Sequence, residues 1–329
     1  MSPAHRRHEN YEFESKRQPL HGADAELHSK VSLTMSTSAS VSFEFFPPTD
    51  AASARALDTA IEQLSPLCPT FVSVTCGAGG SVRSRTRDCV WRLQNSTNLT
   101  VAPHLTCIDS APAEIESTAK VYWEHGIRHI VALRGDLSQP PHLPTPVGRF
   151  GDRYEYASEL VQALNRLGDF EISVAAYPEG HPESGLSVDA DVQNLARKID
   201  AGAKRAITQF FFDTDVFLRY RDRLAARRVS IPLVPGILPI LGISQLFGFA
   251  QRCGATVPPW LRQCFDGLES DPVARRVVAA EVLIGQLQRL RAYGVEAFHF
   301  YTLNRAELTL AACQALDIQP ATKSTDKVA

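Results

Sequence analysis

Hydrophobic and polar residues alternate in two regular ways along this chain from about residue 41 onward. Short runs rich in β-branched and aromatic residues are typical of strands. The segments between them place apolar residues at helical spacing. The strand-like runs are Val41–Phe46, Phe71–Cys76, Thr100–Thr106, His129–Arg134, Glu171–Ala176, Ala206–Phe211, Ile231–Gly236 and Ala297–Tyr301.

The alternation of strands and helices predicts an α/β fold, a (β/α)8 TIM barrel, because eight strand–helix repeats are the count of that barrel. A doubly wound open sheet is the alternative, since periodicity does not reveal whether a sheet closes. The predicted helices are Ala51–Leu64, a segment from Asp109 to Gly126, Tyr154–Leu167, Asp189–Ala201, Asp213–Arg227, Ser244–Arg252, Val273–Tyr293 and Asn304–Leu316.

The 329 residues divide into a leader, one barrel domain and a tail. Residues 1–40 hold four of the ten histidines and little hydrophobic periodicity, which predicts a flexible leader. The barrel domain is expected at 41–318 and a polar tail at 319–329. Met35 is the only internal methionine, so natural translation could start there, which N-terminal sequencing of the native protein would test. Two stretches, 138–153 and 255–271, are too long for simple connections, and long loops on such a scaffold are often functional.

Composition excludes several classes of protein. Apolar residues make up 44% of the chain and charged residues 21%, a globular balance that excludes a wholly disordered or fibrous protein. A net charge of −2 gives no electrostatic case for nucleic acid or an anionic membrane as partner. No apolar run is long enough to span a membrane. Seven cysteines without a C-x-x-C pair predict reduced thiols in a cytoplasmic protein. No histidines or cysteines have the spacing typical of metal ligands, so no metal site is predicted.

The first strand carries the clearest candidate for chemistry, because active sites of barrels lie at the carboxyl ends of the strands. Alternation puts Phe43 and Phe45 on one face of this strand, and Glu44 and Phe46 on the other. A carboxylate on the inner face beside aromatic rings should be desolvated and able to act as an acid near neutral pH. The alternative is a glutamate at the edge of the barrel, in water.

Other strands also end in polar residues, and the set favours a cofactor held by planar stacking and dispersed polar contacts. The turn Thr75–Gly80 fails the dinucleotide fingerprint at Val82, so it is interpreted as a flexible turn near a ligand. Four of the seven lysines lie in the terminal segments, so a Schiff-base aldolase has no well-placed amine. The other polar strand ends hold His104, Arg134, Gly135, Asp136, Tyr177, Glu179, His181, Gln209, His299, Tyr301, Asn304 and Arg305.

Six strings in order along the chain resemble the bacterial methylenetetrahydrofolate reductase family, over about residues 41 to 318. They are VSFEFFPP (41–48), APHLTC (102–107), RHIVALRGD (128–136), AITQFFFD (206–213), PGILP (235–239) and FHFYTLNR (298–305). The resemblance implies a (β/α)8 barrel with noncovalent FAD and with NADH or NADPH as co-substrate. It implies reduction of 5,10-methylenetetrahydrofolate to 5-methyltetrahydrofolate by a ping-pong mechanism, which feeds methionine synthesis.

The resemblance also implies roles for particular residues. Glu44 matches the general acid that assists opening of the folate's five-membered ring, and Asp136 the carboxylate beside flavin and pterin. Gln209 and Phe249 match contacts to folate and nicotinamide, and Gln245 and Arg305 contacts to the benzoyl-glutamate part of folate. The positions matching FAD contacts are Thr75, His104, Leu133, Arg134, Gly135, Asp136, Tyr156, Tyr177, His181, Asp191, Asn194, Arg197 and Lys198.

Spacing adds a detail to the FAD positions. Asp191, Asn194, Arg197 and Lys198 stand three or four residues apart on one predicted helix, so they should share a face. Arg197 and Lys198 would suit a pyrophosphate, and Asp191 a ribose hydroxyl.

Two other functions remain open at this point. One is a barrel lyase that uses Glu44 and Asp136 for proton transfer without a redox cofactor, and the other is an inactive barrel that binds folate or flavin. Related enzymes assemble, so we expect a homo-oligomer, although no exposed seam can be identified in the sequence. The preference between NADH and NADPH is equally undetermined, because no residue that would recognise a 2′-phosphate is evident.

Overall fold

The structure is a computed structural model that describes residues 39–76, 80–108, 110–135, 153–240 and 242–321. Most of the predicted leader, the stretch from 136 to 152 and residues 322–329 lie outside the described residues. The first strand begins at Ser40, so the barrel starts within one residue of the predicted boundary.

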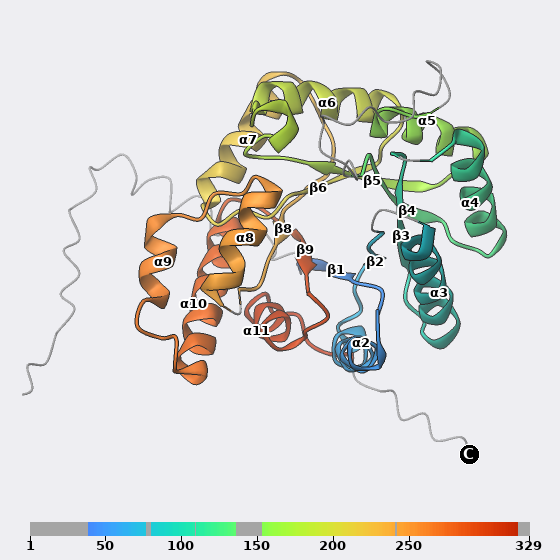
Figure 1. Cartoon of the computed structure of the whole chain (residues 1–329). Helices are drawn as coiled ribbons and strands as arrows, with labels where there is room; N and C mark the ends of the chain where they lie inside the picture. Colours follow the sequence, from blue (N-terminus) through green and yellow to red (C-terminus); the bar gives the residue numbers. More distant parts are fainter. Residues whose placement is uncertain (1–38, 77–79, 109, 136–152, 241, 322–329) are drawn as a thin grey trace, which may run out of the picture. The chain divides into compact units, whose positions relative to one another are not determined.

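The described strand segments form one sheet in which every neighbouring pair is parallel, in the order β7-β6-β5-β4-β3-β2-β1-β9-β8. The helices lie around the outside of this sheet (Figure 1). The strands are β1 (Ser40–Phe45), β2 (Val72–Val74), β3 (Val101–Thr106), β4 (His129–Leu133), β5 (Glu171–Ala176), β6 (Arg205–Thr208), β7 (Leu233–Val234), β8 (Gly236–Ile237) and β9 (Ala297–Tyr301).

The two ends of this sheet are joined by consecutive residues, so the sheet closes. β7 pairs with β6, and β8 pairs with β9. Only Pro235 separates the end of β7 from the start of β8. The carbonyl of Pro235 accepts a hydrogen bond of 3.0 Å from the His299 backbone N–H. Proline has no N–H to donate, which interrupts the ladder and divides the seventh barrel strand in two. The TIM barrel is thereby confirmed over the open sheet, and the predicted continuous strand Ile231–Gly236 is corrected.

Two helices were absent from the sequence prediction. α3 follows β2 and carries four arginines, and its buried apolar residues Cys89, Val90 and Leu93 come late, so periodicity is weak at its start. α9 lies inside the stretch 255–271, where Pro259 occupies the first helical turn. The helices are α2 (Ala51–Leu64), α3 (Gly80–Ser96), α4 (Pro112–Glu124), α5 (Ala157–Leu167), α6 (Val188–Asp200), α7 (Thr214–Ala226), α8 (Ile243–Cys253), α9 (Pro259–Phe265), α10 (Pro272–Ala292) and α11 (Glu307–Ala315), with 3₁₀ turns η1 (Ser65–Leu67) and η2 (Pro182–Ser184).

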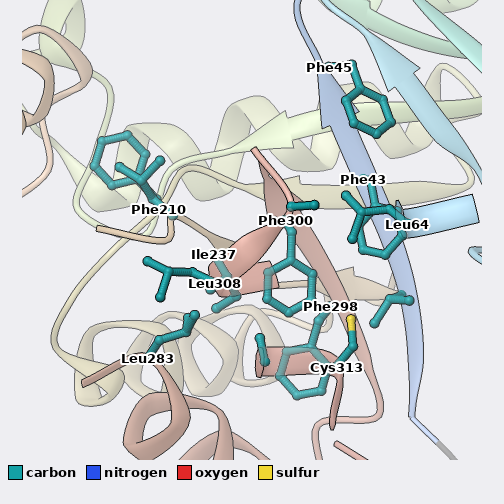
Figure 2. Packing of buried hydrophobic residues seen from close by; sticks show 14 of the residues in the cluster. Phe43, Phe45, Leu64, Phe210, Ile237, Leu283, Phe298, Phe300, Leu308 and Cys313 are labelled. Atoms are coloured by element: carbon teal, nitrogen blue, oxygen red, sulfur yellow. The ribbon is translucent and has the colours of Figure 1, made fainter. Parts of the chain in front are cut away.

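The main core lies between the strands and the helices outside them. Phe43 and Phe45 of β1 are almost completely buried, as the alternation in this strand predicted. Figure 2 shows Phe43 near Phe298 and Phe300 of β9, with Leu308 and Cys313 of α11 in the same cluster. This packing directs the alternate residues of β1 and β9, including Glu44 and His299, toward the inside of the barrel.

Gly236 tests the closure of the barrel. A Cβ at this position would lie 2.1 Å from the carbonyl oxygen of Thr208 and 2.6 Å from the ring of Tyr301. We expect Gly236→Ala to lower the free energy of unfolding by about 1–3 kcal/mol, the usual cost of overpacking, in urea titrations followed by circular dichroism.

Gly285 of α10 provides the matched control, because a Cβ there meets nothing within 4 Å. Gly285→Ala should stabilise the protein by up to about 1 kcal/mol through helix propensity. Equal effects of the two substitutions would contradict the assignment of Gly236 to a tight closing contact.

Candidate functional site

Glu44 of β1 lies inside the mouth of the barrel, between two histidines. Its side chain is 12% exposed, and Oε2 lies 3.4 Å from Nε2 of His104 on β3. The same oxygen lies 3.7 Å from Nε2 of His299 on β9. Strand alternation and barrel closure therefore bring together a carboxyl group and two imidazoles from positions far apart in the sequence.

Burial favours the neutral forms of two groups around Glu44, His104 and Tyr301. Burial lowers the pKa of His104, although the nearby Glu44 carboxylate acts in the opposite direction. Burial also raises the pKa of Tyr301 well above its usual value, and its hydroxyl donates a 2.7 Å hydrogen bond to the carbonyl of Thr208. His299 Nδ1 lies 2.8 Å from the Ser42 hydroxyl. General acid catalysis requires a carboxyl group within reach of the substrate, and Glu44 lies at the barrel mouth, where a substrate could meet it.

An amide and two stacked rings are linked to this part of the barrel through Tyr301, the β9 residue opposite Glu44. Gln209, just after β6, is half-buried, and its Oε1 accepts a 3.0 Å hydrogen bond from the Phe210 backbone N–H. The Phe249 ring of α8 stacks on Phe210 with centroids 5.2 Å apart and planes at 10°. Phe210 in turn meets the edge of Tyr301, with centroids 6.3 Å apart. This arrangement offers a planar, partly apolar surface with one adaptable amide, which suits a flat heterocycle.

A cavity of about 700 Å³ opens at the carboxyl ends of β4 and β5, bounded by α5, η2 and α6. This volume falls within the range of small-molecule and cofactor sites. Ten of the predicted cofactor residues line it: Leu133, Arg134, Gly135, Tyr156, Tyr177, His181, Asp191, Asn194, Arg197 and Lys198. The prediction that the four residues of α6 share a face is thereby confirmed.

Asp191 and Lys198 both line this cavity, Asp191 buried and Lys198 half-buried. Asp191 is 3% exposed, and its Oδ2 accepts no hydrogen bond from the described residues. Burial raises the pKa of Asp191 to about 7, against the effect of Lys198. Burial lowers the pKa of Lys198 to about 8, while its Nζ donates a 2.8 Å hydrogen bond to the carbonyl of Ala175. Such a pair has unused capacity to bind a ligand with hydroxyl and anionic groups.

Local backbone geometry shapes the wall of the cavity. Gly135 follows β4 with φ +89°, and a Cβ there would lie 2.8 Å from Ile108 Cγ2. Only glycine adopts such a conformation readily, so the chain can turn sharply after Arg134. The Arg134 guanidinium then reaches Glu183 of η2, with Nη2 2.6 Å from Oε2.

A sequence-family model described as methylenetetrahydrofolate reductase matches residues 30–317. The chain belongs to the methylenetetrahydrofolate reductase family. The 5,10-methylenetetrahydrofolate reductase of Pectobacterium carotovorum subsp. carotovorum is 46% identical over 306 residues, which cover 93% of this chain and 97% of that protein. The enzyme of the same name from Escherichia coli K12 is 45% identical over the same shares.

A plant sequence and a solved structure are more distant matches. Methylenetetrahydrofolate reductase (NADH) 1 of Arabidopsis thaliana is 32% identical over 83% of this chain, which corresponds to 47% of the plant protein. A solved structure of a Clostridium thermocellum protein, described as binding two copies of 5-methyl-5,6,7,8-tetrahydrofolic acid, superposes with a TM-score of 0.57. It covers 86% of this chain and 96% of its own at 13% identity, a level that supports the fold alone.

Some predicted residues of this family site lie outside the cavity or outside the described part of the chain. Thr75 and His104 do not line the cavity, although Thr106, two residues beyond His104 on the same strand, does. Asp136 lies outside the described residues, as does the side chain of Gln245 in the first turn of α8. Arg305 is exposed just beyond β9.

Two charged residues of the cavity wall were missed by sequence reasoning. Arg83 lines the cavity from α3 and pairs with Glu114 at 3.1 Å, but α3 itself was not predicted. Glu183 follows His181 closely, and only its contact with Arg134 distinguishes it from a surface carboxylate. Proximity in the sequence to a predicted ligand was the one available signal for Glu183.

Within the described residues, no helix is both long and apolar enough to cross a membrane. The same residues contain no group of three or more histidine, cysteine, aspartate or glutamate side chains arranged to hold a metal ion.

His129 gives a testable contrast with the histidines beside Glu44. It is buried deeper in the barrel, where its Nε2 lies 2.8 Å from the Ser173 hydroxyl and its ring packs on Phe71. Burial, reinforced by Arg205, lowers its pKa to about 3. An unfolded chain takes up this proton near pH 6.5 and the folded chain only near pH 3, so this stabilisation is complete above pH 6.5 and is lost progressively toward pH 3.

We expect His129→Gln to remove that acid sensitivity. Between pH 7 and pH 4, the unfolding free energy of the wild type should fall by about 3 kcal/mol more than that of the variant. Urea titrations at the two pH values measure the difference. A difference between the two proteins that stays constant with pH would contradict a neutral buried His129.

Proposed function

We propose that this protein reduces 5,10-methylenetetrahydrofolate to 5-methyltetrahydrofolate with NADH or NADPH, by way of noncovalently bound FAD and a ping-pong mechanism. The product would feed methionine synthesis. The observation that carries this proposal is the convergence of ten predicted cofactor positions on one cavity that adjoins the strand of His104, the neighbour of Glu44. Membership of the methylenetetrahydrofolate reductase family supports it.

The residues of the cavity fit FAD. The unsatisfied, buried Oδ2 of Asp191 suits a ribose hydroxyl donor. Arg197 and Lys198 supply positive charge on the same helix face for a pyrophosphate, and Asn194 holds Arg197 through a 2.8 Å hydrogen bond to its guanidinium. The missing side chain at Gly135 leaves the backbone of the cavity wall accessible at the end of β4. Asp136 is assigned beside the flavin by the family resemblance.

The chain's own residues then act on the folate. Glu44 would hold a proton at the barrel mouth and donate it as the five-membered ring of the folate opens to an iminium. Bound FAD would supply the redox chemistry by accepting hydride from the nicotinamide and delivering it to the folate. Gln209 and Phe249 would bind the two substrates in turn, which requires an adaptable amide and a stacking ring rather than two separate pockets.

The rest of the substrate site is proposed from the family pattern. Arg305, exposed beyond β9, would pair with the carboxylates of the folate's glutamate part. Gln245 would contact the same benzoyl-glutamate part of the folate. Assembly into a homo-oligomer stays a prediction.

The first experiment separates this function from the two alternatives. Purified protein should be yellow, lose its flavin absorbance on anaerobic addition of NADH or NADPH, and regain it with methylenetetrahydrofolate. Protein that binds no FAD would favour a lyase using Glu44 and Asp136. Protein whose flavin is never reduced would favour an inactive binding scaffold. Comparing the two dinucleotides in the same single-turnover assay reveals which donor is used.

Glu44→Gln isolates the acid step. Flavin reduction by the nicotinamide needs no acid at the folate, so it should be nearly unchanged. Reoxidation by methylenetetrahydrofolate should slow by about 10²–10⁴, the range of general acid catalysis. Stopped-flow absorbance of both half-reactions makes the measurement.

Glu171→Gln is the matched control, because Glu171 begins β5 at the opposite end of the barrel and pairs with Arg205 at 3.1 Å. Both half-reactions should be retained in this variant. Comparable losses of both half-reactions in Glu44→Gln would contradict its role as the acid for folate.

A further inference from the structure

The turn between β9 and α11 contains two consecutive non-glycine residues in left-handed conformation. Leu303 has φ 51° and Asn304 has φ 56°. Asparagine tolerates this region, but leucine rarely adopts it, and such strain persists only where surrounding contacts impose it. This turn directly precedes Arg305 and directly follows the buried Thr302.

Hydrogen bonds tie this turn to the end of β1. The Asn304 side chain accepts a 2.9 Å hydrogen bond from the Phe46 N–H through Oδ1 and donates a 3.0 Å hydrogen bond to the Phe46 carbonyl through Nδ2. Thr302 donates two hydrogen bonds to the Glu44 carbonyl, from its hydroxyl at 2.6 Å and its N–H at 3.3 Å. The Thr302 hydroxyl also accepts from the Asn304 N–H at 3.1 Å.

The amide of Asn304 substitutes for a peptide group at this point. The regular β1–β9 pairing ends at Glu44 and Tyr301, and β1 continues into Phe46 and two prolines. Because Pro47 has no N–H, the backbone ladder has no donor with which to continue along β1. A primary amide presents one donor and one acceptor side by side, so Asn304 adds one more pair of hydrogen bonds beyond the last backbone pair.

We propose that Asn304 is a positioning residue for the folate half of the reaction, an inference that rests on the proposed function. By fixing Phe46 to the β9–α11 turn, it sets the distance between the Glu44 carboxyl group and Arg305, which follows Asn304 directly. It also holds the Phe46 ring, 39% exposed, at the mouth of the barrel. Glu44 and Arg305 would address opposite parts of one folate, so their mutual placement determines whether the proton reaches the opening ring.

The same geometry explains why the effect is selective. The Asn304 side chain bonds Phe46, just after β1, and does not line the cavity wall at β4, β5 and α6, where FAD is proposed to bind. FAD affinity and flavin reduction should therefore be insensitive to Asn304. Folate binding and flavin reoxidation should be sensitive, since misplacement of reacting groups by about 1 Å is enough to slow a reaction severely.

Asn304→Gly is the decisive variant, because glycine accepts the left-handed conformation and loses only the two hydrogen bonds to Phe46. We expect reoxidation by methylenetetrahydrofolate to slow at least about tenfold, with weaker binding of 5-methyltetrahydrofolate. Flavin reduction by the nicotinamide and the Kd for FAD should change less than about twofold. Stopped-flow absorbance and flavin fluorescence titration measure these quantities.

Arg228→Gly is the matched control, because Arg228 has φ 56° in the turn after α7, at the opposite end of the barrel. It should leave both half-reactions and folate affinity unchanged. Asn304→Asp keeps the acceptor for the Phe46 N–H but loses the donor, so its reoxidation rate should fall between those of the wild type and Asn304→Gly. If Asn304→Gly does not fold, Asn304→Asp tests the positioning role in its place.

The outcomes separate the two proposals. Equal slowing of both half-reactions, or an unchanged reoxidation rate in a folded Asn304 variant, overturns the positioning role while the proposed function stands. Wild-type protein that reduces no methylenetetrahydrofolate overturns the proposed function and this inference together. Selective loss in the folate half-reaction, with FAD affinity retained, supports both.

Discussion

Closure of the parallel sheet is the constraint on which the rest of the structure depends. The short segment on either side of Pro235 hydrogen-bonds to β6 on one side and to β9 on the other, which converts an open sheet into a ring. In a ring of parallel strands all carboxyl ends meet at one mouth. Glu44 from the first strand and His299 from the last are neighbours because β1 pairs directly with β9. The absence of a side chain at Gly236 allows the closing strand to approach Thr208.

The inside of this barrel is more polar than the packed aliphatic layers usual for the fold. Ser42, Ser73, His129, Ser173 and His299 are all buried there, around a small apolar group that includes Phe71. Burial lowers the pKa of His129 to about 3 and also lowers the pKa of His104, so these two imidazoles are held neutral. The carboxyl group of Glu44 lies beside two imidazoles at the mouth of this interior. The hydrophobic contribution to stability comes instead from the layer outside the strands.

The sequence predicts features that depend on neighbouring residues, and it does not reveal contacts between segments that are far apart along the chain. The Phe43–Glu44–Phe45 alternation and the helix face of Asp191 and Lys198 were predictable, because both follow from the period of one element. α3 escaped prediction because its apolar residues come late among arginines, and α9 because adjacent prolines looked like a loop. The pairing of Arg134 with Glu183, and of Asn304 with Phe46, joins segments whose spacing in the sequence carries no periodic signal.

The sequence by itself determined the type and order of the elements, the face that each presents, and the family resemblance of its strand ends, since these depend on residue type and short-range spacing. Only the tertiary structure decided that the sheet closes, that ten predicted cofactor positions share one cavity, and which groups surround Glu44. Those outcomes depend on contacts between residues up to 258 positions apart, as between Phe46 and Asn304. Such contacts form only when the packing of all the strands has fixed their register.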